Sequence, residues 1–177
     1  MKHMIYYTDK KLTIRQMIET DAQVIYDTYL SYGWHPNLET YQRYFAEQGT
    51  RRITFVAEYC GEVAGHVSLL YFPAPDERGP FEGIPLISDL CVFFHRHNLG
   101  IASRLLDVLE AETAKTSDTV CLAVGCHSGY GAAQRLYVKR GYIFDGSGVW
   151  WNEKQLEQYA PCVNDDGLVL WMSKKIK

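Results

Sequence analysis

The segment from Asp89 to Glu110 constrains the fold of this chain more than any other stretch. Leu90–Phe94 is a short apolar run rich in branched and aromatic side chains, which predicts a buried strand. A polar turn follows, and beyond it apolar residues recur at helical spacing, at Ile101, Leu105, Val108 and Leu109. The segment therefore predicts a strand, a tight turn and a helix in direct succession.

A turn of this kind is suited to bind an anion. The first N–H groups of a helix have no intrahelical acceptors and lie at the positive end of the helix dipole. Gly100 and Ala102 are small, and larger side chains would keep phosphate oxygens away from the backbone. An ordinary tight turn is the alternative, because Gly-x-Ala alone is a common sequence. The dinucleotide fingerprint is excluded, since residues 103–105 supply no third glycine.

Two blocks of this sequence resemble the GNAT superfamily of acetyl-CoA-dependent N-acetyltransferases. The first family pattern, Leu-x-Val followed by Gln/Arg-x-x-Gly-x-Gly/Ala, is matched by Leu90-Cys91-Val92 and by His97-Asn98-Leu99-Gly100-Ile101-Ala102. His97 stands where the family usually has Gln or Arg. The second pattern, Asn-x-x-Ala-x-x-Leu-Tyr-x-Lys-x-Gly-Phe, is matched from Tyr130 through Ala133 and Tyr137 to Tyr142, with Tyr130 in place of Asn. The two blocks occur in the family's order, which makes the resemblance specific.

The chain has 177 residues, and 47% of them are hydrophobic, which is enough for one domain with a core. A net charge of −3 argues against a nucleic-acid partner. No apolar run reaches membrane-spanning length, and residues 1–9 lack the apolar stretch of a signal peptide. The five cysteines form no Cys-x-x-Cys pair and lie mostly in apolar segments, so we expect reduced thiols and a cytoplasmic protein.

Hydrophobic periodicity by itself predicts a mixed α/β domain. Strands are expected at residues 12–18, 53–59, 63–72, 87–94, 119–124, 142–144 and 168–172, the last two as an antiparallel pair. Thr20 and Asn37 are expected to cap the first two helices, and further helices begin near Gly100 and Gly131. The resemblance implies a single GNAT-like domain of the α/β (α+β) class over residues 1–177. Its mixed sheet should have about six to seven strands flanked by about four helices.

The resemblance also implies the coenzyme, acetyl-CoA, and the residues that bind it. Backbone N–H groups from Asn98 to Ser103 would bind the pyrophosphate, and the pantetheine arm would pair with the backbone of Leu90, Cys91 and Val92. The further coenzyme-binding positions implied are His97, Leu99, Gly100, Ile101, Ala102, Tyr130 and Ala133. No metal is implied.

The same resemblance implies direct attack of an amine on the thioester in a ternary complex. The backbone N–H of Val92 would donate to the thioester oxygen, and Tyr137 would protonate the departing sulfur. The base that deprotonates the amine is left open among Glu82, Asp89 and His127. Charged groups in solvated loops or at strand ends are the alternative reading of these three.

The acceptor is left open between a small-molecule amine and a protein amine. Trp34, His35 and Trp151 are candidates for substrate contacts, because aromatic faces attract cationic amines. The sequence does not specify the acyl-chain length, and a homodimer stays open.

Two other readings belong to different functional classes. The departures at His97 and Tyr130 allow a non-catalytic acyl-CoA sensor or scaffold of the same fold. Alternatively, Cys126 beside His127 would be an acyl-accepting nucleophile in a ping-pong enzyme. Neighbouring residues of a strand point to opposite faces, so this pair would meet only in a turn.

Overall fold

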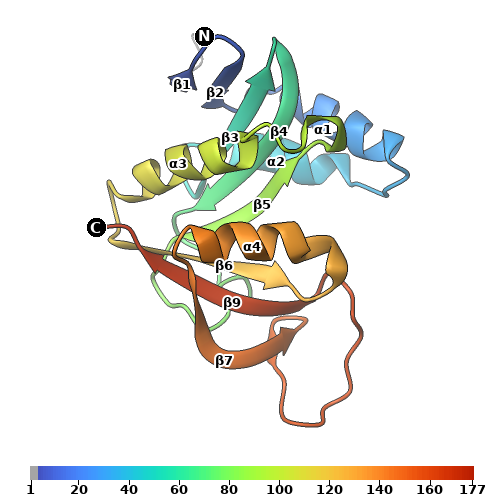
Figure 1. The fold of residues 1–177 in the computed structure, drawn as a ribbon, viewed down its shortest axis with the longest axis vertical. Helices are drawn as coiled ribbons and strands as arrows, with labels where there is room; N and C mark the ends of the chain where they lie inside the picture. The colour runs from blue at the N-terminus through green and yellow to red at the C-terminus, as the bar shows by residue number, and fades with distance from the viewer. Residues whose placement is uncertain (1–3) are drawn as a thin grey trace. The chain divides into compact units, whose positions relative to one another are not determined.

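A computed structural model describes residues 4–177 of the chain, with four α-helices and nine strands in a mixed α+β fold (Figure 1). The mixed fold and the four helices confirm the expectation, whereas the strand count is higher than about six to seven. The two additional strands are short: β1 (Ile5–Thr8) and β8 (Lys154–Gln155). Neither shows a long alternating pattern, so each depends on its neighbouring strand for its extended conformation.

The chain forms two compact units, which are described separately. The first comprises Met1–Tyr71 and Ser88–Glu112, and the second comprises Phe72–Ile87 and Thr113–Lys177. A single domain over residues 1–177 stays a prediction.

The first unit contains a run of strands in the order β1-β2-β3-β4-β5. After β1 come β2 (Leu12–Gln16), β3 (Arg52–Tyr59), β4 (Glu62–Leu70) and β5 (Leu86–Val92), whose last five residues lie in this unit. The β3–β4 pair is the expected hairpin, and it turns at Cys60 and Gly61, both with positive φ. The helices of this unit are α1 (Asp21–Ser31), α2 (Leu38–Ala46) and nearly all of α3 (Ile101–Thr113).

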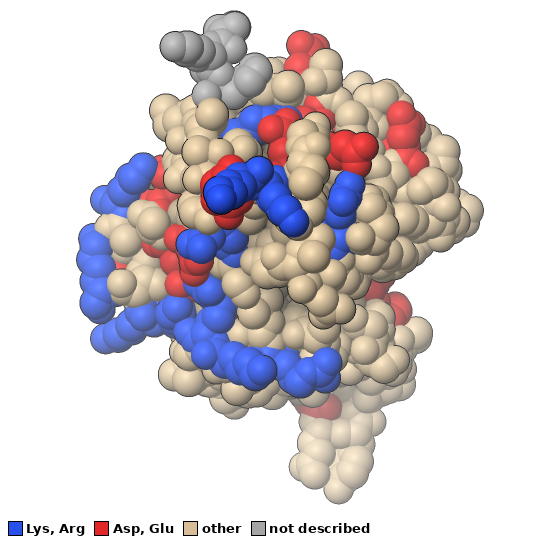
Figure 2. Space-filling model, turned by 45° about the horizontal axis from the view of Figure 1, so that its top comes forward, with Lys and Arg blue, Asp and Glu red and all other residues tan. Residues whose placement is uncertain are grey.

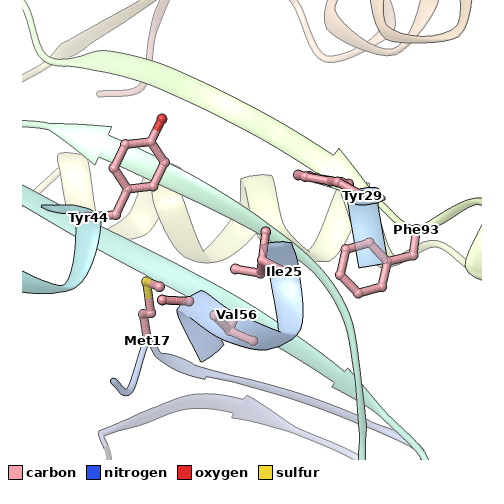
Figure 3. Packing of buried hydrophobic residues seen from close by; sticks show 7 residues of the cluster. Met17, Ile25, Tyr29, Tyr44, Val56 and Phe93 are labelled. Atoms are coloured by element: carbon pink, nitrogen blue, oxygen red, sulfur yellow. The ribbon is translucent and has the colours of Figure 1, made fainter. Parts of the chain in front are cut away.

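Helices α1 and α2 contact one another (Figure 1), and both contribute buried side chains to one apolar cluster. Ile25 and Tyr29 of α1 are four residues apart and therefore lie on the same face. They pack with Met17, Val56 of β3 and Phe93, which follows β5 (Figure 3). This cluster therefore holds the two helices against β3 and against the segment that follows β5.

The entry into α1 is held by a buried ion network. The Arg15 guanidinium of β2 donates to Asp21 through Nη1 at 2.7 Å and Nη2 at 2.9 Å, and to Glu58 of β3 through Nε and Nη2. Burial alone would lower the pKa of Arg15, but the bonds to the two carboxylates outweigh it and raise this pKa. Asp21 also accepts from the backbone N–H of Ile18 at 2.7 Å.

The two expected N-caps behave differently. Asn37 caps α2 as predicted, because its side chain accepts from the backbone N–H of Glu39 at 2.9 Å. Thr20 makes no side-chain capping bond and is itself helical. Asp21 and Arg15 stabilise the start of α1 in its place, a long-range interaction that a local capping pattern does not reveal.

The second unit contains the strand order β5-β6-β9-β7-β8. Its elements after the start of β5 are β6 (Thr119–Gly125), α4 (Gly131–Lys139), β7 (Ile143–Trp151), β8 and β9 (Leu168–Lys175). Leu86 and Ile87 of β5 pair in parallel with Cys121 and Leu122 of β6. The predicted antiparallel pairing of the last two long strands is confirmed, since β7 pairs with β9.

Strand β7 is longer than the three residues predicted for it. Its register shifts between Phe144 and Val149, where Gly146 and Gly148 have φ of +85° and +83°. The glycines of this stretch are typical of a turn, but here they form an irregular bulge and the strand resumes beyond it.

We expect Asp21→Asn to lower the free energy of unfolding by about 3–5 kcal/mol, because it leaves the Arg15 cation without a partner that is itself buried. Urea unfolding followed by circular dichroism measures the change. Asp107→Asn is the matched control, since Asp107 pairs with Arg104 on the surface and its loss should cost less than about 1 kcal/mol. Equal losses in the two variants would contradict the role given to the buried pair.

Candidate functional site

The connection between β5 and α3 is a turn whose backbone enters the left-handed region twice. After Val92 the chain makes a short 3-10 turn over Phe94–Arg96, and then Asn98 has φ of +62° and Gly100 has φ of +76°. No atom lies within 4 Å of the position that a Cβ would occupy at Gly100. Glycine is therefore favoured here by its backbone conformation, and the space above it is open.

The start of α3 fits an anionic group such as the coenzyme pyrophosphate. Helix α3 begins at Ile101 with no acidic residue in its first turn, and the N–H of Arg104 is bonded to the carbonyl of Gly100. The N–H groups before Arg104 are those that a helix leaves without intrahelical acceptors. Figure 2 shows Lys and Arg side chains gathered in a band on the face in view, with Asp and Glu side chains among them.

His97 lies in this turn, but its ring is directed at the end of the strand. Nε2 lies 2.8 Å from the carbonyl oxygen of Val92, and the ring meets Phe94 edge-on at 5.6 Å. His97 therefore joins the turn to β5. Asn98 and Leu99 beside it are exposed.

Leu90, Cys91 and Val92 are half-buried, and their backbone is supported by a close approach of β4. A Cβ on Gly65 would lie 2.5 Å from the carbonyl oxygen of Cys91 and 2.9 Å from Cα of Val92. Sequence reasoning missed Gly65. A glycine inside the apolar run 63–72 was the available signal, since such a glycine often marks a close backbone contact.

Asp89 occupies a strained position in the middle of β5. Its φ is +52°, which is unusual for a residue other than glycine. Its Oδ2 atom accepts hydrogen bonds from the hydroxyl of Tyr44 in α2 and, at 3.1 Å, from Ser88. The ring of Tyr44 lies 3.9 Å from the guanidinium carbon of Arg52. Tyr44 and Arg52 were not identified from the sequence.

A buried polar pair, Tyr29 and His66, lies near Asp89. The hydroxyl of Tyr29 is 2.7 Å from Nε2 of His66, and Nδ1 of His66 has no hydrogen-bond partner among the described residues. Burial lowers the pKa of His66 to about 4, despite the opposing attraction of Asp89 and Asp21. His66 is therefore neutral at physiological pH.

In the second unit, Tyr137 lies on α4 and is buried. Its ring packs against Tyr142 at 5.6 Å in an edge-on arrangement. Burial raises the pKa of Tyr137, and the nearby Tyr130 raises it further. The phenol is therefore protonated at neutral pH and has a proton to donate.

The other base candidates and the second motif also lie in this unit. Glu82 is exposed and pairs with Arg78 at 3.3 Å. His127 accepts from the N–H of Gly129 at Nδ1 (3.1 Å), and its Nε2 lies 3.0 Å from Asp166. The hydroxyl of Tyr130 donates to the same Asp166 oxygen at 3.0 Å, and Ala133 is half-buried on α4. Both ring nitrogens of His127 are thus engaged, which leaves no free lone pair for a base.

The structure distributes the three substrate candidates over different settings. Trp34 packs against Tyr29 at 4.9 Å and Phe94 at 5.5 Å and remains 43% exposed. His35, beside it, is also exposed. Trp151 ends β7 in the second unit and donates from Nε1 to Asp165 at 3.1 Å.

Cys126 does not have the properties of an activated nucleophile. Partial burial and the neighbouring Cys162 raise the pKa of its thiol, whereas a nucleophilic cysteine needs a lowered one. Within residues 4–177 no group of three or more His, Cys, Asp or Glu side chains could hold a metal ion. In the same range, none of the helices combines the length and the apolar character needed to cross a membrane.

The sequence pattern of the Acetyltransferase (GNAT) family matches residues 19–142, which is most of the chain and includes both motifs. The chain belongs to the GNAT acetyltransferase family. No curated protein matches it closely in sequence.

Solved GNAT structures share the fold at low sequence identity. A GNAT-family protein from Desulfovibrio desulfuricans has a TM-score of 0.70 at 15% identity, over 94% of this chain and 99% of that one. The yncA protein of Salmonella typhimurium, solved with its cofactor acetyl-CoA, has a TM-score of 0.69 at 18% identity, over 95% of both chains. The ribosomal-protein-S18-alanine N-acetyltransferase from Escherichia coli has a TM-score of 0.67 at 18% identity, over 93% of this chain and 94% of that one.

The buried, neutral His66 should make the stability of this GNAT protein depend on pH. Its folded pKa lies below the unfolded value of 6.5, so its contribution is complete above pH 6.5 and is lost as the pH falls toward about 4. As the pH falls through this window, the free energy of unfolding of the wild type should decrease. Its slope should exceed the slope of His66→Gln by up to about 1.4 kcal/mol per pH unit. Urea unfolding at several pH values measures both slopes, and parallel slopes would contradict the assignment.

Proposed function

We propose that this chain transfers an acetyl group from acetyl-CoA to a primary amine by direct attack in a ternary complex. The observation that carries the proposal is the open left-handed turn at Asn98 and Gly100, which leads into a helix with no acid in its first turn. It follows directly on the strand residues that the family uses for the pantetheine arm. Backbone donors at a helix start and a strand backbone beside them are what an anionic, amide-containing coenzyme requires.

Acetyl-CoA supplies the acetyl thioester. The N–H groups of residues 98–103 bind its pyrophosphate, and the backbone of Leu90–Val92 pairs with its pantetheine amides. The backbone N–H of Val92 donates to the carbonyl oxygen as negative charge develops there. Support for this comes from Gly65, whose close contact fixes the backbone of β5 at Cys91 and Val92.

Tyr137 is the proton donor to the departing sulfur in this proposal. It occupies the tyrosine position of the second motif, and its raised pKa keeps the phenol protonated. His97 is bonded to the carbonyl oxygen of Val92 and stabilises the turn. It contributes to coenzyme binding indirectly, by holding in place the neighbouring residues whose backbone binds the coenzyme.

The acceptor is a small-molecule amine or a protein amine. Exposed Trp34 and its neighbour His35 offer an aromatic surface for it in the first unit. The Escherichia coli enzyme of similar fold acts on the alanine of ribosomal protein S18, so a peptide with an N-terminal alanine belongs among the acceptors tested. A non-catalytic acyl-CoA sensor is the alternative, favoured by the replacements at His97 and Tyr130.

The first test follows free CoA by chromatography after the protein is incubated with acetyl-CoA and a pool of small amines and peptides. Chromatography is preferred to a thiol dye because the protein has five cysteines. Amine-dependent release of CoA supports the transferase. Acetyl-CoA binding by calorimetry without release from any acceptor would favour the sensor, and absence of binding would contradict both.

Tyr137→Phe should lower kcat by about 100-fold, because the proton donor is lost while the ring and its packing remain. The Kd for acetyl-CoA, measured by calorimetry, should change less than twofold. Tyr26→Phe, a helix tyrosine in the other unit, is the control for loss of a hydroxyl group. Full turnover in Tyr137→Phe would remove the assignment.

A further inference from the structure

We propose that the Asp89 carboxylate takes the proton from the acceptor ammonium, and that Tyr44 is the residue that positions this carboxylate. The inference rests on the proposed acetyl transfer and selects one of the three base candidates. It also assigns a role to the Tyr44–Arg52 pair. Neither of these two residues belongs to the family motifs described above.

The conformation of Asp89 is the first observation. A residue other than glycine is strained at φ of +52°, and such strain persists only where the surroundings enforce it. Here the surroundings are the two donors on Oδ2, Ser88 and Tyr44. Both donors bind Oδ2, and Oδ1 receives no hydrogen bond from the described residues. A carboxylate fixed through one oxygen presents the other as a proton acceptor.

Tyr44 is itself held rigidly. It is 6% exposed, and Arg52 lies against its ring at 3.9 Å. Arg52 is in turn bonded through Nε to Glu47 at 3.0 Å. In Figure 3 the hydroxyl of Tyr44 points away from Met17, Ile25 and Val56, whereas its ring belongs to their cluster. Packing thus fixes the ring and leaves the hydroxyl for Asp89.

The chemistry of Tyr44 suits a donor that is never a base. Burial raises its pKa, the charge of Asp89 raises it further, and Arg52 opposes this only in part. The phenol therefore stays protonated at neutral pH and donates a hydrogen bond to the carboxylate of Asp89. Asp89 is exposed, as Glu82 is, but it alone is bonded to a buried tyrosine. Glu82 pairs with Arg78 in a loop, and both ring nitrogens of His127 are engaged.

The proton balance of the reaction follows from these roles. Asp89 takes one proton from the ammonium, directly or through water, and releases it to solvent after the transfer. The free amine forms the C–N bond to the acetyl carbon as the C–S bond breaks. The second proton lost from nitrogen replaces the one that Tyr137 gives to sulfur. The net reaction converts ammonium and thioester into amide, thiol and one solvent proton.

The test compares Asp89→Asn and Tyr44→Phe with Asp27→Asn and Tyr26→Phe, matched changes on α1. CoA release with n-propylamine as acceptor is followed between pH 6 and pH 9. Asp89→Asn should lower kcat about 100-fold near pH 7. The deficit should shrink as the pH rises, because more of the amine is then already unprotonated. Tyr44→Phe should lower kcat about 10-fold through loss of positioning, and the controls should stay within twofold.

A second measurement does not depend on the acceptor. Tyr44 is 6% exposed, and its hydroxyl proton is bonded to a carboxylate, which slows its exchange with water. Proton NMR should therefore show a resonance that Tyr44→Phe loses and that Asp89→Asn shifts, because an amide oxygen is a weaker acceptor than a carboxylate. Absence of that resonance from the wild type, or wild-type rates and pH profile in Asp89→Asn, would overturn the proposal. Failure of the wild type to bind acetyl-CoA in calorimetry would instead overturn the proposed function.

Discussion

The ion network of Arg15, Asp21 and Glu58 is the interaction on which the first unit depends. It joins β2 to β3 and fixes the start of α1 in one buried group. A charge buried in this way is tolerated only when its partners are in place, so the network specifies one arrangement of these elements. Helix α1 then carries Ile25 and Tyr29 into the cluster that also receives α2. Everything proposed for Tyr44 and Asp89 follows from that placement.

Backbone conformation, more than side-chain chemistry, shapes β5 and the turn that leads into α3. Gly65 admits a close approach of two strands, Asp89 interrupts β5 with a left-handed residue, and Gly100 turns the chain into α3. A side chain at Gly65 would collide with β5, and a side chain at Gly100 would be strained by the backbone conformation. Asp89 does carry a side chain, and its hydrogen bonds compensate for the strain. The result is a turn with open space beside Gly100, directly before the first turn of α3.

Burial gives the same property to three tyrosines with different roles. The pKa of Tyr29, of Tyr44 and of Tyr137 is raised mainly by desolvation, so all three remain protonated donors. Tyr29 contacts a neutral His66 and Tyr44 contacts Asp89, whereas Tyr137 is placed by the second motif. A phenol in such surroundings can hold a carboxylate or supply a proton, but it does not act as a base at neutral pH.

The sequence alone determined the mixed fold, the hairpin, the strand–turn–helix at residues 90–109 and the family, because these depend on local periodicity and on motifs of fixed spacing. It also predicted the Asn37 cap, which is a contact between neighbours. Only the tertiary structure decided that Arg15 and Asp21 replace Thr20 at the start of α1. It also brought Gly65 against Cys91. Finally, it placed the Tyr44 hydroxyl on Asp89 and the Tyr44 ring against Arg52. These pairs are separated by 6 to 45 residues in sequence. No local pattern encodes such contacts, since they form only when separate elements pack together.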